Sequence, residues 1–184
     1  MIIKFYELIK IDKNKFHIFL LYGKNEGLQN QTLKENFIIN FKGEVLKYDE
    51  QEFIVNYENI VSEILTKSLF KDEKLIIISR ASDKILRYIE ELSDKKITDL
   101  KIVLKSGQLD KKSKLRSFFE KSKQYGLIPC YEDNEITIKN IITSKLKGFK
   151  NLTTLNVNLI VDNSNLNRIK LNNELNKILT YFQN

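Results

Sequence analysis

The residues best placed for chemistry form the loop Gly23–Gly27 (GKNEG), which follows the apolar run Phe16–Tyr22 and precedes a helical pattern. A glycine-containing loop between a strand and a helix is where a P-loop binds nucleotide phosphates. A working P-loop also needs a lysine and a serine or threonine directly after its last glycine, to bind the phosphates and Mg²⁺. Here Leu28 and Gln29 follow instead. The sequence therefore predicts a nucleotide-binding architecture without its nucleotide chemistry.

Other groups that catalyse reactions are scarce. His17 is the only histidine and Cys130 the only cysteine, which excludes an intrachain disulfide, a cysteine metal cluster and a histidine-dependent triad. The apolar run Leu75–Ile78 ends in Ser79 and Arg80, where an ATPase would place carboxylates for Mg²⁺. We expect no catalytic residue, metal or cofactor. We expect His17 to be a packed or edge side chain in mid-strand and Cys130 to be a buried small apolar group.

An apolar pair, Leu69 and Phe70, stands where an α/β protein normally turns. It follows a helical stripe that ends near Leu65, and a charged segment, residues 71–74, comes next. Leaving a large apolar side chain in water costs about 1.5–3 kcal/mol relative to burying it. The pair is therefore either the last turn of a buried helix face or an anchor for a partner's pocket. From this segment alone, the buried turn is the favoured interpretation.

The net charge of +7 comes mostly from one segment, because residues 101–125 contain eight basic and two acidic side chains. Such a segment suits phosphate or an acidic protein surface, and its candidate DNA contacts are Lys111, Lys112, Lys114 and Arg116. The alternative is an ordinary solvated helix face. Only four of the 31 basic residues are arginines. Since arginine makes most bidentate contacts to bases, the composition disfavours sequence-specific DNA reading.

Short apolar runs alternate with helical stripes through the first 133 residues. The runs are Phe16–Tyr22, Val45–Tyr48, Leu75–Ile78, Leu100–Leu104 and Leu127–Tyr131. The stripes between them are Leu33–Phe41, Phe53–Leu65, Ile85–Leu92 and Leu115–Ser122. This alternation predicts a parallel sheet with helices on both faces. Pro129 has no N–H to donate, so we expect the last strand at a sheet edge.

Beyond residue 133 the pattern changes to two amphipathic helices, Ile138–Phe149 and Leu171–Phe182, with the polar stretch 162–165 before the second. We therefore expect an α/β domain over residues 1–133 and a small, truncated helical domain over residues 134–184. The longest apolar run is too short to cross a bilayer, and the first residues lack the pattern of a signal peptide. The sequence predicts a cytoplasmic protein with no membrane contact.

Four blocks, in order along the chain, resemble the delta subunit of bacterial DNA polymerase III, the clamp-opening member of the clamp loader. They are IFLLYGKNEGL (residues 18–28), SLFKDEKLIIISRASDKI (68–85), LDKKSKLRSFFEKSKQYGLIPCYEDNE (109–135) and LNRIKLNNELNKILTYF (166–182). The third block is the most specific, because its Lys-Ser-x-Leu-Arg core, its phenylalanines and its Pro-Cys-Tyr all stand at the expected spacing.

The resemblance implies an AAA+ (RecA-like) parallel-sheet domain without a working P-loop, followed by a helical lid. It implies that Leu69 and Phe70 bind the beta sliding clamp and open it for loading onto primed DNA. In that family the chain itself has no catalytic activity, although it belongs to a DNA-directed DNA polymerase (nucleotidyltransferase) holoenzyme. Its implied partners are the gamma/tau and delta prime subunits, and ATP hydrolysis belongs to other loader subunits. The family's collar domain is absent from this sequence.

Two other function classes stay open from the residues alone. The first is a P-loop-type ATPase or nucleotide kinase relative, which fits the predicted topology but lacks the lysine, hydroxyl and carboxylates of that chemistry. The second is a basic nucleic-acid-binding α/β module, which fits the charged segment 101–125 but has no platform of aromatic and arginine side chains. The clamp-loader interpretation accounts for the incomplete loop, the apolar pair and the four blocks together.

Overall fold

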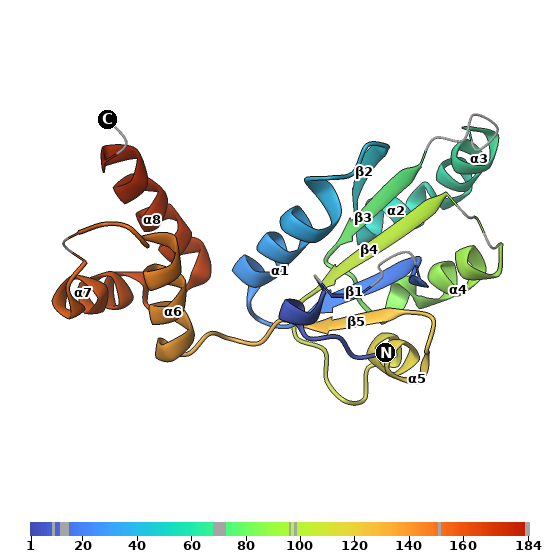
Figure 1. The fold of residues 1–184 in the computed structure, drawn as a ribbon. Helices are drawn as coiled ribbons and strands as arrows, with labels where there is room; N and C mark the ends of the chain where they lie inside the picture. The colour runs from blue at the N-terminus through green and yellow to red at the C-terminus, as the bar shows by residue number, and fades with distance from the viewer. Residues whose placement is uncertain are drawn as a thin grey trace.

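The computed structural model describes residues 1–8, 10–11, 15–67, 73–95, 97, 99–150 and 152–182, and its centre is a parallel sheet (Figure 1). The strands are β1 (Ile18–Tyr22), β2 (Glu44–Asp49), β3 (Lys74–Ser79), β4 (Leu100–Ser106) and β5 (Gly126–Pro129). Their spatial order is β2-β3-β4-β1-β5, and every pairing is parallel. The predicted parallel sheet is confirmed, and Pro129 lies in an edge strand as expected.

Helices cover both faces of the sheet, which explains why its central strands are apolar at nearly every position. One face carries α2 (Glu50–Val55), α3 (Tyr57–Lys67), the short 3₁₀ turn η5 (Asp83–Ile85), α4 (Leu86–Asp94) and α5 (Lys114–Lys121). The other face carries the turn η1 (Phe5–Glu7), α1 (Glu26–Leu33) and its π-helical continuation η3 (Lys34–Ile38). Alternate strand residues serve the two cores: Leu20 and Ile76 pack on the first face, Phe19 and Ile77 on the second.

The helix expected over Phe53–Leu65 is two helices, because the chain breaks at Asn56. The Asn56 side chain donates a hydrogen bond to the Glu52 carbonyl at 3.0 Å, and its backbone leaves the helical region. An asparagine that bonds its own backbone in this way competes with helix continuation. Helix α2 starts sharply, since Asp49 and Glu52 form a capping box around its first turn.

Three helices follow the sheet: α6 (Glu135–Lys145), α7 (Thr154–Ser164) and α8 (Arg168–Phe182). They share an apolar core of their own, made by Ile138, Ile142, Leu146, Val161, Leu171 and Leu175. The sequence predicted only two of them. Helix α7 was not predicted, because its leucines do not form a single buried stripe. Leu155 is 69% and Leu159 is 53% exposed. Part of the stretch expected to be a polar break, residues 162–164, is its last turn.

No helix in the described part of the chain is both long and apolar enough to cross a membrane.

Cys130 is the buried apolar group that the sequence predicted. Its side chain is fully buried, and burial raises the pKa of the thiol to about 12. A thiol whose folded pKa lies above its unfolded pKa favours the folded state below the unfolded value. That contribution is lost as the pH rises toward the folded pKa.

We therefore predict that maleimide labels Cys130 at pH 8 roughly 100-fold or more slowly in the native chain than in denaturant, because the reactive thiolate is both rare and covered. The Ser144→Cys variant places a second thiol on an exposed position of α6 and serves as the control for reagent access. Rapid labelling of Cys130 in the folded chain would contradict the burial described above.

Candidate functional site

The loop Gly23–Gly27 lies at the carboxyl end of β1, where open α/β sheets place their ligands. Strand β1 pairs with β4, yet the chain leaves β1 toward β2 at one edge and leaves β4 toward β5 at the other. A strand pair whose connections diverge in this way opens a crevice at its carboxyl ends. The predicted position of the nucleotide loop is therefore confirmed, and the residues in the crevice decide what it can bind.

A buried glutamine side chain joins the two strand ends at this crevice. The Gln29 amide donates to the Gly23 carbonyl at 2.9 Å and to the Ser106 carbonyl at 2.8 Å, and the residue is 2% exposed. The Gly23 N–H donates to the Gly107 carbonyl at 3.0 Å. The two carbonyls and the Gly23 N–H are therefore hydrogen-bonded within the chain. In a phosphate-binding loop the N–H groups must instead be free for the ligand.

Both glycines of the loop serve contacts within the protein. A Cβ at Gly23, whose φ is +133°, would overlap with the Cys130 carbonyl oxygen. A Cβ at Gly27 would lie 2.7 Å from the Cβ of Arg168, at the start of α8. Glycine is thus required at residue 23 by the turn and β5, and at residue 27 by the close approach of α8.

A buried polar network connects this loop to α8. The Asn25 amide donates to Asp133 Oδ2 at 2.8 Å and to the Tyr131 carbonyl at 3.0 Å, while its oxygen caps α1 by accepting from the Leu28 N–H. Arg168 forms a bidentate ion pair with Asp133, with Nε 2.8 Å from Oδ2. Its Nη1 donates to Gln31 at 3.0 Å. The side chains of the pair are only 2% and 4% exposed.

Removing one partner of such a buried pair typically costs about 3–5 kcal/mol, because the other charge is left without compensation. The pair is therefore a strong constraint on the structure. It also commits the arginine to Asp133, since its bidentate fork is filled by the carboxylate.

The hollow beside this network is unsuited to a nucleotide triphosphate. Its volume is about 480 Å³, and Lys24 and Arg168 are the cations among its lining side chains. The carboxylates of Glu26, Glu132 and Asp133 line the same hollow. Acidic groups therefore outnumber basic ones there, and phosphates bring further negative charge into repulsion with them.

The carboxyl end of β3 holds the cation that the sequence predicted. Arg80 follows the strand in a left-handed conformation (φ 59°), and its Nε lies 2.5 Å from Asp49 at the end of β2. The nearby Glu50 accepts hydrogen bonds from the N–H and hydroxyl of Ser82. Within the described residues, no group of three or more His, Cys, Asp or Glu side chains could hold a metal ion. The acidic side chains here cap turns and pair with arginine.

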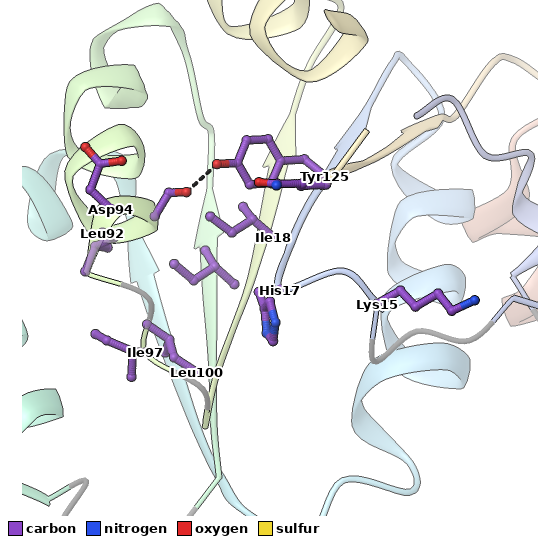
Figure 2. Close-up of a pocket in the computed structure, with 11 residues that line it drawn as sticks. Lys15, His17, Ile18, Leu92, Asp94, Ile97, Leu100 and Tyr125 are labelled. Carbon is purple, nitrogen blue, oxygen red and sulfur yellow. Dashed lines mark hydrogen bonds between the residues drawn. The ribbon is translucent and has the colours of Figure 1, made fainter. Parts of the chain in front are cut away.

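A second hollow, of about 590 Å³, lies at the opposite, amino-terminal edge of the sheet (Figure 2). Ile18, Leu92 and Leu100 give it an apolar wall, and the Ser93 and Tyr125 hydroxyls bond to each other across one end. His17 lies here as well. It is exposed and precedes β1, so its expected place in mid-strand was wrong.

The predicted clamp-binding residues, Leu69 and Phe70, lie outside the described residues. Helix α3 ends at Lys67 and β3 begins at Lys74. The first residue of β3, Lys74, lies at the amino-terminal edge of the sheet. This is the edge opposite the Gly23–Gly27 loop.

The predicted DNA-contact residues lie in the turn before α5 and in its first turn. Lys111, Lys112 and Lys114 are exposed. Arg116 differs, because its Nε lies 2.8 Å from Glu120, its Nη1 donates to the Leu109 carbonyl at 3.1 Å, and its guanidinium covers the Tyr22 ring. Three lysines thus remain available to an anionic partner, whereas the arginine is used within the chain.

The sequence analysis missed the residues that close the crevice: Asn25, Gln29, Gln31, Asp133 and Arg168. Their signal is weak, because amides and single carboxylates are common in loops. The arginine offered the best hint. Only four of the basic residues are arginines. An arginine in such a chain indicates a carboxylate partner that accepts two parallel hydrogen bonds from its planar guanidinium.

The sequence matches no family model and no curated protein. Among solved structures, the chain is similar to the Bacillus subtilis DNA clamp loader delta protein (YqeN), with a TM-score of 0.59 and 15% identity. The similarity covers 97% of this chain and 57% of that one. The chain shares its fold with that part of the delta protein. A Rhizobiales Trip13 structure is also similar, with a TM-score of 0.52, 15% identity and coverage of 83% and 60%.

These two likenesses confirm the expected AAA+ (RecA-like) α/β fold with a helical region after it. They concern the fold, since identity is 15% in both cases. The chain spans 57% of the length of the delta protein.

We predict that millimolar Mg-ATP leaves the melting temperature unchanged, because Gln29 and Arg168 occupy the crevice and its hollow is acidic. A ligand at 100 times its dissociation constant stabilises a protein by about 2.7 kcal/mol, which corresponds to roughly 5 °C or more for a chain of this size. Differential scanning fluorimetry with Mg²⁺ alone as the control measures the shift. A clear rise with Mg-ATP would show that the crevice can open.

We also predict weak, salt-sensitive binding of duplex DNA that depends on the exposed lysines in the turn before α5 and at its start. Replacing Lys111, Lys112 and Lys114 by alanine should reduce the slope of log affinity against log salt by roughly one for each phosphate that is no longer neutralised. The matched control replaces three exposed lysines of the helical region, Lys145, Lys147 and Lys150. Equal reductions in both triple variants would mean that only net charge matters.

Proposed function

We propose that this chain is a clamp-loader delta-type subunit that binds the beta sliding clamp and opens it for loading onto primed DNA in DNA replication. The observation that carries the proposal is the likeness to a clamp loader delta protein over 97% of the chain. The closed crevice supports it, because a subunit that works by binding a partner needs no nucleotide of its own.

The proposal assigns different tasks to different parts of the loader. Residues 1–133 are the clamp-binding domain and residues 134–184 are a helical lid. ATP hydrolysis falls to the gamma/tau subunits, which hold this chain in the assembly together with delta prime. The chain then takes part in the polymerase holoenzyme without catalysing a step itself.

Burial along α3 bears on the choice between an exposed anchor and a buried turn at Leu69 and Phe70. Along this helix Ile60, Val61 and Ile64 are buried against the sheet. The next apolar residue, Leu65, is 47% exposed. Ile64 is thus the last buried residue that the structure describes in α3. Leu69 and Phe70 are our candidates for the side chains that enter a pocket of the clamp.

The other two function classes find less support. An ATPase or nucleotide kinase requires phosphate-binding N–H groups and a metal ligand at the crevice, where Gln29 and the Arg168–Asp133 pair now lie. A nucleic-acid-binding module of the stacking type needs exposed aromatic side chains among its cations. In α5, Phe119 is buried in the core and Phe118 is half-buried against it.

We predict that the double variant Leu69→Ala, Phe70→Ala loses roughly 3 kcal/mol or more of clamp-binding free energy, a factor of over about 100 in affinity. Its melting temperature should change little if the pair is an anchor outside the core, as proposed. If the pair belonged to the core, the same change would cost on the order of 5 kcal/mol of folding stability. Surface plasmon resonance on the organism's own beta clamp and a melting curve measure the two quantities.

The matched control is Leu155→Ala with Leu159→Ala, which removes two exposed apolar side chains from α7. It should leave clamp affinity at the wild-type value. Undetectable clamp binding by the wild-type chain would overturn the proposed function. Unchanged binding by a folded Leu69→Ala, Phe70→Ala variant would overturn the assigned anchor alone.

A further inference from the structure

We propose that the buried Arg168–Asp133 pair is a lock that fixes the three-helix part (residues 135–182) against the sheet part (residues 1–130) without any nucleotide. The proposal goes beyond the clamp-binding function, because it concerns how the two parts are held in position. It rests on contacts at the carboxyl edge of the sheet, far from the α3–β3 segment.

The two parts have separate apolar cores, so something else must set their relative position. The three-helix core contains no residue from the sheet or from α1 to α5. The two sheet cores contain no residue from α6 to α8. Figure 1 shows the three helices grouped beside α1 and connected to β5 by an extended segment without helix or strand. Such an arrangement permits rotation about the connection unless a specific contact prevents it.

The polar network supplies that contact from three directions. Arg168 belongs to the first turn of α8, Asp133 to the connection after β5, and Gln31 and Asn25 to α1 and the loop before it. Asp133 accepts from both Arg168 and Asn25, while Arg168 also donates to Gln31. The ion pair is almost fully buried. Rotation of the helices would expose or separate these charges, which is strongly unfavourable in the protein interior.

The backbone turn before α8 determines where Arg168 lies. Asn165 and Leu166, which separate α7 from α8, both have left-handed backbone conformations, with φ of 48° and 56°. Two adjacent residues without glycine in this region form a sharp, sparsely populated turn. The turn brings Arg168 directly over Gly27, where the missing side chain leaves room for its Cβ. The lock therefore combines a bidentate charge pair with a close helix contact.

The consequence is a fixed arrangement of the two parts in every nucleotide state of the surrounding assembly. A protein whose helical part is held by a bound nucleotide changes shape as that ligand comes and goes. Here the charge that holds α8 is a covalent part of the chain, Asp133. The two parts should therefore move as one body.

The test measures distances between spin labels on Glu58→Cys in α3 and Asn176→Cys in α8, both exposed positions, in the full chain. The buried thiol of Cys130 does not compete for the label. We expect one narrow distance distribution that Mg-ATP does not alter. Arg168→Met should widen the distribution at least about twofold, because it removes the charge pair while keeping an apolar stem.

The matched control is Arg116→Met, which breaks an ion pair within α5 and should leave the width unchanged. Gly27→Ala is an independent probe, since its Cβ pushes α8 away and should shift the mean distance. If Arg168→Met does not fold, Asp133→Asn tests the same pair with an isosteric side chain, and widening is again expected. A folded Arg168→Met or Asp133→Asn variant with the wild-type width would overturn the lock. Equal widening in the Arg116→Met control would overturn it as well.

Discussion

The structure depends on how the carboxyl ends of β1 and β4 are joined. In this fold the two strands diverge in their connections, and a ligand normally fills the space between them. The Gln29 amide fills it here by donating to a carbonyl on each side. Because these carbonyls are buried, the amide cannot be removed without leaving unsatisfied polar groups. The α1 cap at Asn25 lies beside this closed crevice, and α8 docks on the same loop through Gly27 and Asp133.

Arginine use in the chain follows the same logic. Lysine supplies the surface charge, whereas two of the four arginines, Arg116 and Arg168, each bond to more than one group inside the chain. A planar guanidinium can satisfy several acceptors at fixed angles, which a lysine ammonium cannot do. The rare arginines therefore mark positions where geometry matters more than charge.

Strands β1 and β3 were predictable because they are buried on both faces, so that Phe16–Tyr22 and Leu75–Ile78 are apolar almost without interruption. Helix α7 was not, since Leu155 and Leu159 face solvent and remove the periodic signal. The incomplete P-loop could be read from Leu28 and Gln29 alone. The network that closes it could not, because Asn25, Asp133 and Arg168 are far apart in sequence and meet only through tertiary packing. The sequence thus argued against a working P-loop at this site, but it could not identify the polar network that lies there.

The contact between Gly27 and Arg168 also bears on whether nucleotide binding could be introduced into this loop. Placing lysine and threonine after Gly27 would supply the two side chains that a phosphate-binding loop uses there, although Gly23 and Gly27 would still stand one residue closer together than the two glycines of that loop. The same two substitutions would remove Leu28 from the second core and Gln29 from its two carbonyls. Helix α8 would still stand over the loop, held by Asp133. Each of these substitutions would therefore destabilise the fold before any ligand could compensate.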